Sequence, residues 1–157
     1  MPMSGFAQAA RMVRFAALSA FVACTSATAP QQTDLAVARQ RWALSNVRSY
    51  NYTVYRFCEC PPQWSQGITV SVSNGIVTSR INATTGQPAA SSDVFSTIDA
   101  LFDTVDAAIA GHADYVNASY DSVTGVPLRI SIDRSFQVID DEYWLTVANF
   151  RAGLTGP

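Results

Sequence analysis

Two cysteines separated by a single residue are the most reactive side chains of this 157-residue chain. Cys58 and Cys60 follow a run of aromatic and β-branched residues, so an extended backbone would direct both thiols to the same side. Their Cα atoms would lie about 6.5–7 Å apart, near the upper limit for a disulfide, and Pro61-Pro62 can supply the bend that closes it. We expect a small structural disulfide in an oxidising compartment. A redox-active pair and a soft-metal thiolate site are the alternatives.

The chain's only histidine, His112, follows Gly111 near the expected end of a helix, where a cation meets the negative end of the helix dipole. No G-x-S-x-G elbow or other nucleophile signature accompanies it, so a capping or exposed position is favoured over general-base catalysis. All ten basic residues are arginine, and the absence of lysine excludes Schiff-base chemistry and a P-loop lysine. We therefore expect a non-enzymatic protein without a cofactor.

Two groups of carboxylates have the side chains for cation binding but lack a binding pattern. The first has helical spacing and is interpreted as a solvated helix face: Asp99, Asp103 and Asp106. The second comprises Asp133 and the run 140–142 (DDE). Clustered carboxylates can hold calcium, but the twelve-residue calcium-loop pattern is missing, so an ordinary loop between strands is favoured and no metal site is expected.

Residues 120–127 (YDSVTGVP) form the most distinctive local motif. Asp121 can accept hydrogen bonds from the amides of a turn, Gly125 can adopt positive φ, and Pro127 can begin an edge strand. Each of these residues therefore has a structural explanation. As a ligand or turn site, the group would comprise these three residues and Asp133.

The composition bounds the class of protein. Of the 157 residues 48% are apolar and 14% are charged, and the net charge is −2. A chain of this length forms one domain and buries roughly two-thirds of its unfolded surface. The apolar content excludes a disordered chain, and the lack of a basic excess argues against a nucleic-acid partner.

Residues 1–23 have the layout of a bacterial export signal. Arg11 and Arg14 provide a positive start, and the apolar run 15–23 is far shorter than the ~20 residues that a membrane-spanning helix needs. We therefore expect this segment to be a signal peptide and the rest of the chain to leave the cytosol.

Phe21-Val22-Ala23-Cys24 resembles the lipobox of bacterial lipoproteins, with phenylalanine where leucine is usual. The resemblance implies that Cys24 becomes the lipidated N-terminus of the mature chain and anchors it to a bilayer of the cell envelope. The alternative is a secreted protein whose signal is cut near residues 27–29. We expect residues 24–32 to form a flexible tether and residues 33–154 to form a single domain.

Hydrophobic periodicity predicts eight elements. Two helices are expected, from a cap at Thr33 or Asp34 to about Asn46, and from a cap at Ser91 or Ser92 to Gly111. Six strands are expected, over residues 49–58, 68–73, 76–82, 114–121, 128–133 and 143–150. Trp42 is the expected packing anchor of the first helix, and Asn74-Gly75 favours a two-residue hairpin turn.

The order α-β-β-β-α-β-β-β with short turns predicts an α+β fold, an antiparallel sheet of about six strands with two helices packed on one face. The two halves share this order without obvious residue identity. In outline the arrangement is similar to small secreted modules of the PepSY and β-lactamase-inhibitor kind, a likeness of shape that implies no function.

Five marks over residues 40–150 together resemble a family of bacterial lipoproteins and secreted proteins known only as a domain of unknown function. The marks are Trp42 with Ser49-Tyr50-x-Tyr52, Cys58-x-Cys60, Asn74-Gly75 with Val77, Ile98-Asp99-x-Leu101-Phe102, and Tyr120-Asp121-x-x-x-Gly125-x-Pro127 before Ile130-x-Ile132-Asp133. Val126 departs from the aromatic residue that the family tends to carry there. The resemblance implies an exported single domain and no activity.

The preferred hypothesis is a lipid-anchored, non-enzymatic envelope protein that offers a surface to another envelope protein or a small ligand. Aromatic residues are dense around the first predicted strand and the cysteine pair: Tyr50, Tyr52, Tyr55, Phe57 and Trp64. An exposed subset of them is the first place to look for a partner. The alternatives are a thiol-redox protein that uses Cys58 and Cys60, and a metal-binding envelope protein.

Overall fold

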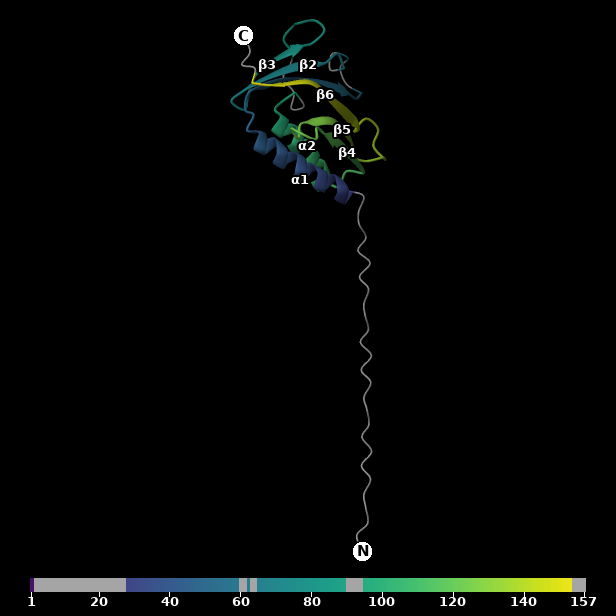
Figure 1. Cartoon of the computed structure of the whole chain (residues 1–157). Coiled ribbons are helices and arrows are strands. Elements are labelled where there is room, and N and C mark those ends of the chain that lie inside the picture. The colour runs from purple at the N-terminus through teal and green to yellow at the C-terminus, as the bar shows by residue number, and fades with distance from the viewer. Residues whose placement is uncertain (2–27, 60–61, 63–64, 90–94, 154–157) are drawn as a thin grey trace.

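Two helices pack on one face of a six-stranded antiparallel sheet (Figure 1) in the computed structural model, which describes residues 1, 28–59, 62, 65–89 and 95–153. The elements are α1 (Thr28–Ser45), β1 (Tyr50–Phe57), β2 (Ile68–Ser73), β3 (Ile76–Asn82), α2 (Ile98–Ala110), β4 (Tyr115–Tyr120), β5 (Pro127–Asp133) and β6 (Tyr143–Ala152). This order confirms the predicted α+β fold. None of the helices in these ranges is long and apolar enough to span a membrane.

The sheet order is β3-β2-β1-β6-β5-β4, so the first strand of the chain pairs with the last one at the centre. Alternation of apolar and polar residues fixes which side of each strand faces the helices. In β2, for example, Ile68, Val70 and Val72 are buried and the residues between them are half-buried. The predicted Asn74-Gly75 hairpin is confirmed, with φ of 51° and 81°, the left-handed values that this turn requires.

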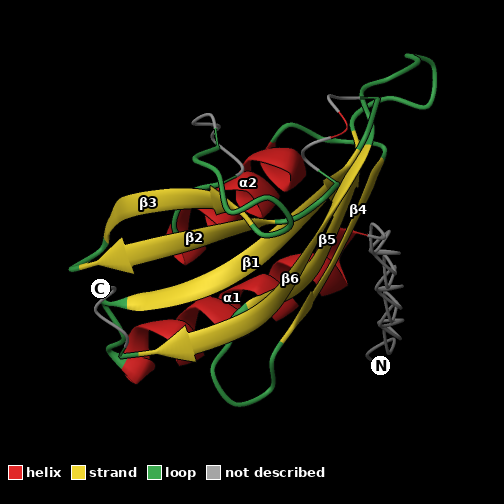
Figure 2. Cartoon of the chain, turned by 90° about the horizontal axis from the view of Figure 1, so that it is seen from above, coloured by secondary structure: helices red, strands yellow, loops and turns green. Residues whose placement is uncertain are grey.

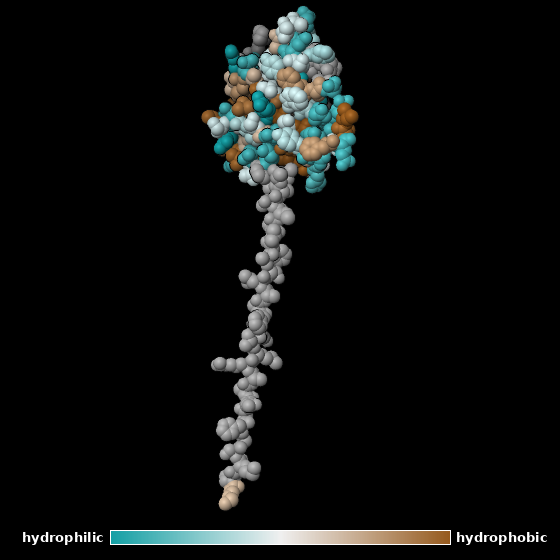
Figure 3. Space-filling view, turned by 90° about the vertical axis from the view of Figure 1, so that its right-hand side faces the viewer, coloured by the Kyte–Doolittle hydropathy of each residue, from teal (hydrophilic) through white to brown (hydrophobic). Residues whose placement is uncertain are grey.

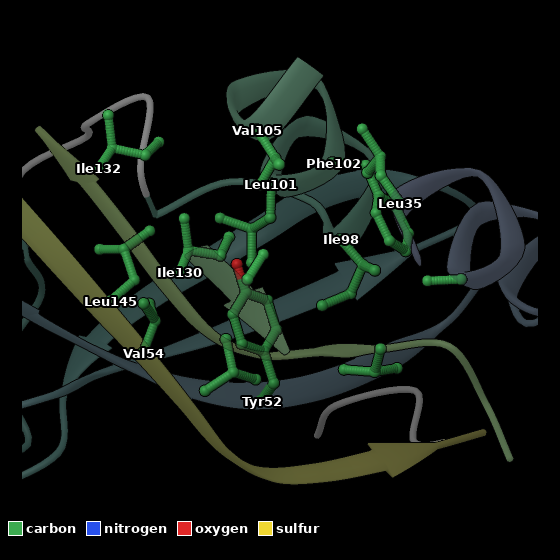
Figure 4. Close-up of a cluster of buried hydrophobic side chains, with 14 of the residues drawn as sticks. Leu35, Tyr52, Val54, Ile98, Leu101, Phe102, Val105, Ile130, Ile132 and Leu145 are labelled. Carbon is green, nitrogen blue, oxygen red and sulfur yellow. The ribbon is translucent and has the colours of Figure 1, made fainter. Parts of the chain in front are cut away.

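The hydrophobic core lies between the helices and the sheet (Figure 4). Leu101 of α2 lies close to Tyr52 and Ile130 of the sheet, and Phe102 of α2 lies beside Leu35 of α1, with all five side chains buried. This close packing of one helical stripe against one sheet face is what holds the two layers together.

The start of α2 differs from the prediction. Ser91 and Ser92 lie outside the described residues, and the helix begins at Ile98 with Thr97 as its N-cap, because the Thr97 hydroxyl accepts a hydrogen bond from the Ala100 amide. Two buried tyrosines hold this end, since the Tyr50 hydroxyl accepts from the Ile98 amide and the Tyr52 hydroxyl donates to the Ser96 carbonyl. Burial raises the pKa of Tyr50 to about 12, so its hydroxyl stays protonated.

The start of α1 also differs. The helix begins at Thr28 rather than at Thr33 or Asp34, so residues 28–32 of the expected tether are helical. The side-chain oxygen of Gln31 accepts a hydrogen bond from the amide of Ala118 in β4, which ties this first turn to the edge of the sheet. The buried side chains of α1 are Leu35, Ala38 and Trp42, which confirms Trp42 as a packing anchor, whereas Ser45, one turn further on, is exposed.

The β4–β5 turn contacts α1 closely. Gly125 has a φ of +79°, and a Cβ at this position would lie 2.2 Å from the Ala38 carbonyl oxygen, so only glycine fits without a shift of the helix. Just beyond it, the pairing skips Leu128, because Tyr120 pairs with Pro127 and Ser119 with Arg129. This bulge turns Leu128 outward, so Leu128 is exposed although simple alternation along 128–133 would place it on the buried face with Ile130 and Ile132.

Candidate functional site

The motif at residues 120–127 builds a turn. The Asp121 carboxylate accepts hydrogen bonds from the Thr124 amide at 2.7 Å, the Thr124 hydroxyl at 2.8 Å and the Val123 amide at 3.1 Å. These bonds, the one from the Thr124 amide above all, hold the pKa of the Asp121 carboxyl below its ordinary value. Because the folded-state pKa is lowered, the stabilisation is present at neutral pH and is lost as the pH falls through that pKa.

The candidate ligand group of Asp121, Gly125, Pro127 and Asp133 is not a common site. Pro127 and Asp133 are the two ends of β5, and the pairing partners of these residues, Tyr120 and Tyr115, are the two ends of β4. The turn and Asp133 therefore lie at opposite ends of the same hairpin. The first three residues shape the turn against α1, and Asp133 belongs to a different environment.

Asp133 lies among other carboxylates. The pKa of the Asp133 carboxyl is raised, chiefly because the group is partly buried. Repulsion by the negative charges of Asp141, Glu142 and Asp114 raises it further. Within the described ranges, no group of three or more histidine, cysteine or acidic side chains is arranged to hold a metal ion.

The aspartates of α2 face α1. Asp103 and Asp106 are largely exposed, as a solvated face predicts, yet the Arg39 guanidinium lies 2.8 Å and 3.7 Å from their carboxylates. Asp99 accepts a hydrogen bond from the Trp42 indole at 3.1 Å. The spacing along one helix identified the shared face but could not show that a second helix lies beside it.

His112 follows the end of α2 on an exposed stretch. Gly111 is the C-cap, as predicted. Its amide donates to the Ala107 carbonyl at 2.9 Å, and the His112 amide donates to the Ile109 carbonyl at 3.1 Å. The left-handed residue is His112 itself, with a φ of 54°. The histidine is exposed, in agreement with the capping or exposed position that the sequence favours.

Of the cysteines, the structure describes Cys58 only. Cys58 directly follows β1 and is half-buried against the core. Cys60 and Cys24 lie outside the described residues, so the Cys58–Cys60 disulfide and the lipidation of Cys24 stay predictions. Trp64, one of the aromatic residues singled out beside the cysteine pair, also lies outside them.

A hollow of about 220 Å³ lies in the surface next to Cys58. The lining comes from the end of β1, the residues after it and the start of β6: Arg56, Phe57, Cys58, Glu59, Pro62, Ser65, Glu142 and Trp144. We call this region the β1–β6 hollow. It lies where the two central strands of the sheet meet at one end.

A stacked aromatic pair forms one wall of the β1–β6 hollow. Phe57 and Trp144 are cross-strand partners, with ring centroids 5.9 Å apart and an interplanar angle of 18°. They remain 36% and 46% exposed, whereas Tyr50 and Tyr52 of the same strand are buried. Strand alternation places them on the face away from the helices. Phe57 belongs to the aromatic cluster that the sequence indicates, whereas Trp144 does not, because only the pairing of β1 with β6 brings the two rings together.

The lining of the β1–β6 hollow has more negative than positive side chains. Glu59 and Glu142 contribute two exposed carboxylates, and Arg56 contributes the one guanidinium in the lining. That guanidinium lies 4.8 Å from the centroid of the Tyr143 ring, and burial lowers its pKa from the ordinary arginine value. The exposed aromatic faces and the carboxylates together suit a ligand that carries positive charge.

Two further hollows lie beside α1. One, of about 260 Å³, is lined by residues that include Trp42, Tyr50, Gly75 and Asp99, which brings three of the five marks of the sequence to one place. Trp42 packs edge-on against Tyr50 there, at a centroid distance of 5.3 Å. The other, of about 360 Å³, lies between α1 and β4. Trp42 contacts both Tyr50 and Asp99 there, which gives these three residues a structural role.

Comparison with known proteins gives one match. Residues 34–152 match a protein family described as a family of unknown function (DUF6174). Searches of curated proteins and of solved structures return no match.

Proposed function

The chain belongs to this family of unknown function, DUF6174, and from its own residues we propose that it is an exported, lipid-anchored protein of the cell envelope that acts as a non-enzymatic binding module. The observation that carries the proposal is the exposed Phe57–Trp144 stack in the wall of the β1–β6 hollow. Large aromatic side chains left in contact with water are a recurrent feature of binding surfaces, where they supply most of the binding free energy.

The charges of the hollow define the class of ligand. A guanidinium or ammonium group placed over the Trp144 ring would gain a cation–π interaction, and Glu59 and Glu142 would neutralise its charge. We therefore infer that the ligand is a cationic group on an apolar stem, such as an arginine side chain of a partner protein.

Replacing Trp144 with alanine is expected to weaken binding of a tri-arginine peptide about tenfold, because the aromatic wall is lost while the fold is retained. Titration calorimetry at low salt measures the change. Tyr115→Ala is the matched control, since Tyr115 is 44% exposed, close to the 46% of Trp144, but is not among the residues that line the hollow. Equal affinities of the two variants, or no binding by the native chain, would refute the ligand assignment.

Lipid anchoring is supported by the lipobox-like residues 21–24. The intact mass of the chain purified from membranes is expected to equal that of residues 24–157 plus a diacylglyceryl group and any N-acyl chain. Cys24→Ser is expected to remove the lipid mass and release the chain from the membrane fraction. A native chain that starts elsewhere and lacks lipid would contradict the anchor and would favour the secreted alternative.

The same mass measurement addresses the thiol-redox candidate, which is favoured by the position of Cys58 in the lining of the hollow. If the disulfide is structural, we expect Cys58 and Cys60 to be alkylated only after reduction. We also expect the pair to stay oxidised in redox buffers down to about −300 mV. A pair that is reduced at a higher potential would favour the redox protein over the binding module.

A further inference from the structure

The loop between β5 and β6, residues 134–142, exposes three large apolar side chains within four positions. Phe136 is 68% exposed, Val138 54% and Ile139 88%. The other exposed apolar residues of the described surface, the cross-strand pair Phe57 and Trp144 among them, come from separate segments of the chain. On the face that Figure 3 presents, small hydrophobic patches lie among hydrophilic residues. The β5–β6 loop differs because its apolar residues are neighbours in one segment.

Hydrogen bonds hold the β5–β6 loop in this outward conformation. The Asp114 carboxylate accepts from the Phe136 amide at 2.9 Å, and the Asp114 amide donates to the Arg134 carbonyl at 3.3 Å. Within the loop the Val138 amide donates to the Ser135 carbonyl at 2.9 Å, which closes a turn. These hydrogen bonds therefore fix the conformation of the turn from which the apolar side chains project.

The β5–β6 loop lies at the end of the domain where the chain enters α1. Gln31 of α1 contacts Ala118 of β4, and Ala38, further along α1, contacts Gly125 in the β4–β5 turn. The first turn of α1 therefore points toward Tyr115, the end of β4 that is paired with Asp133, and the loop begins at the next residue. Figures 1 and 2 show the start of α1, the end of β5 and the start of β6 on the same side of the molecule.

The proposed lipid anchor, Cys24, is close in the chain to the start of α1. Only four residue steps separate Cys24 from Thr28, the first residue of α1. A chain spans at most about 3.6 Å per residue, so whatever its conformation the Cα atom of Thr28 lies within about 14 Å of the Cα atom of Cys24. A lipid on Cys24 would therefore hold the start of α1, and with it this end of the sheet, next to the bilayer.

We propose that the β5–β6 loop docks on the bilayer surface and places Phe136, Val138 and Ile139 among the lipid headgroups and upper acyl chains. This inference rests on the lipid anchor of the proposed function. Burial of apolar side chains supplies the driving force. Asp140, Asp141 and Glu142 follow the apolar residues directly, so anionic lipid would oppose docking, and the surface that fits is a zwitterionic one. The loop thus fixes the orientation of the anchored domain.

Tryptophan scanning at two matched positions tests the docking. Ile139→Trp and Val123→Trp both replace highly exposed apolar residues, 88% and 81% exposed, and Val123 lies in the β4–β5 turn at the opposite end of the hairpin. Each lipidated full chain is reconstituted in phosphatidylcholine vesicles, with and without bromine on the acyl chains. The extra emission over the native chain is expected to be quenched at least twofold more strongly for Ile139→Trp than for Val123→Trp.

The outcomes separate the docking from the anchor. Equal quenching of the two variants in chains whose mass shows the lipid would overturn the docking and leave the anchor intact. Chains whose mass shows no lipid would overturn both. Mixing phosphatidylglycerol into the vesicles is expected to reduce the quenching of Ile139→Trp, because the loop carboxylates are repelled by it. Quenching that increases with anionic lipid would contradict the proposed mode of docking.

Discussion

Gly125→Ala is expected to lower the free energy of unfolding by about 4 kcal/mol, enough to leave a typical domain marginally stable. Two costs add. An alanine at a φ of +79° pays about 1–2 kcal/mol for its left-handed backbone, and its Cβ would lie 2.2 Å from the Ala38 carbonyl oxygen, which must move. Moving a helix backbone inside a packed domain costs a further 1–3 kcal/mol, roughly.

Gly153→Ala is the matched control for this prediction. Gly153 has a φ of +78°, but an alanine Cβ there meets no atom within 4 Å. It therefore pays the backbone cost alone, about 1–2 kcal/mol. Urea unfolding followed by circular dichroism measures both variants. Similar losses in the two would show that the contact between α1 and the β4–β5 turn is looser than described.

Trp42→Ala is expected to cost about 3–5 kcal/mol, because a large side chain that is 6% exposed is removed from between α1 and the sheet. The indole ring packs against Tyr50 at 5.3 Å and Phe150 at 5.9 Å between ring centroids, and its N–H donates to Asp99 on α2. One residue of α1 thus contacts both layers of the fold, and its loss weakens the attachment of the whole helix.

Two further substitutions resolve this effect into its parts. Trp42→Phe keeps most of the apolar volume and removes the hydrogen bond to Asp99, so a loss of about 1–2 kcal/mol is expected. Leu44→Ala, on the same helix at a side chain that is 77% exposed, is expected to change stability by less than about 0.5 kcal/mol. Thermal unfolding ranks the three, and a Leu44 variant as unstable as Trp42→Ala would show that α1 packs with a different face.

Sequence reasoning identified the elements whose signals are local. Hydrophobic periodicity and the Asn74-Gly75 turn predicted β2 and its return strand β3, and helical spacing predicted the two helices that form α1 and α2. The Asp121 turn was also predicted, because its hydrogen bonds join residues only two and three positions apart. In each case the residues that interact are close in the chain, so their types and spacing contain the information.

What sequence reasoning missed depends on contacts between distant segments. The start of α2 at Ile98 is fixed by Tyr50 and Tyr52 of β1, which no local pattern at residues 91–98 reveals. The outward turn of Leu128 follows from the register of β4 against β5. The Phe57–Trp144 wall exists only because β1 and β6 are neighbours, and the sequence predicts six strands without their order.

The central position of β1 and β6 has a consequence for the order of events in biogenesis. Every residue of β6 follows the other five strands in the chain, yet β6 joins β1 to β5. A nascent or translocating polypeptide therefore holds two separate parts of the sheet, β3-β2-β1 and β5-β4, each with an unpaired inner edge, until its final segment has emerged. Premature termination near the C-terminus would leave both edges open to intermolecular strand addition, so such products would be candidates for aggregation and proteolytic clearance.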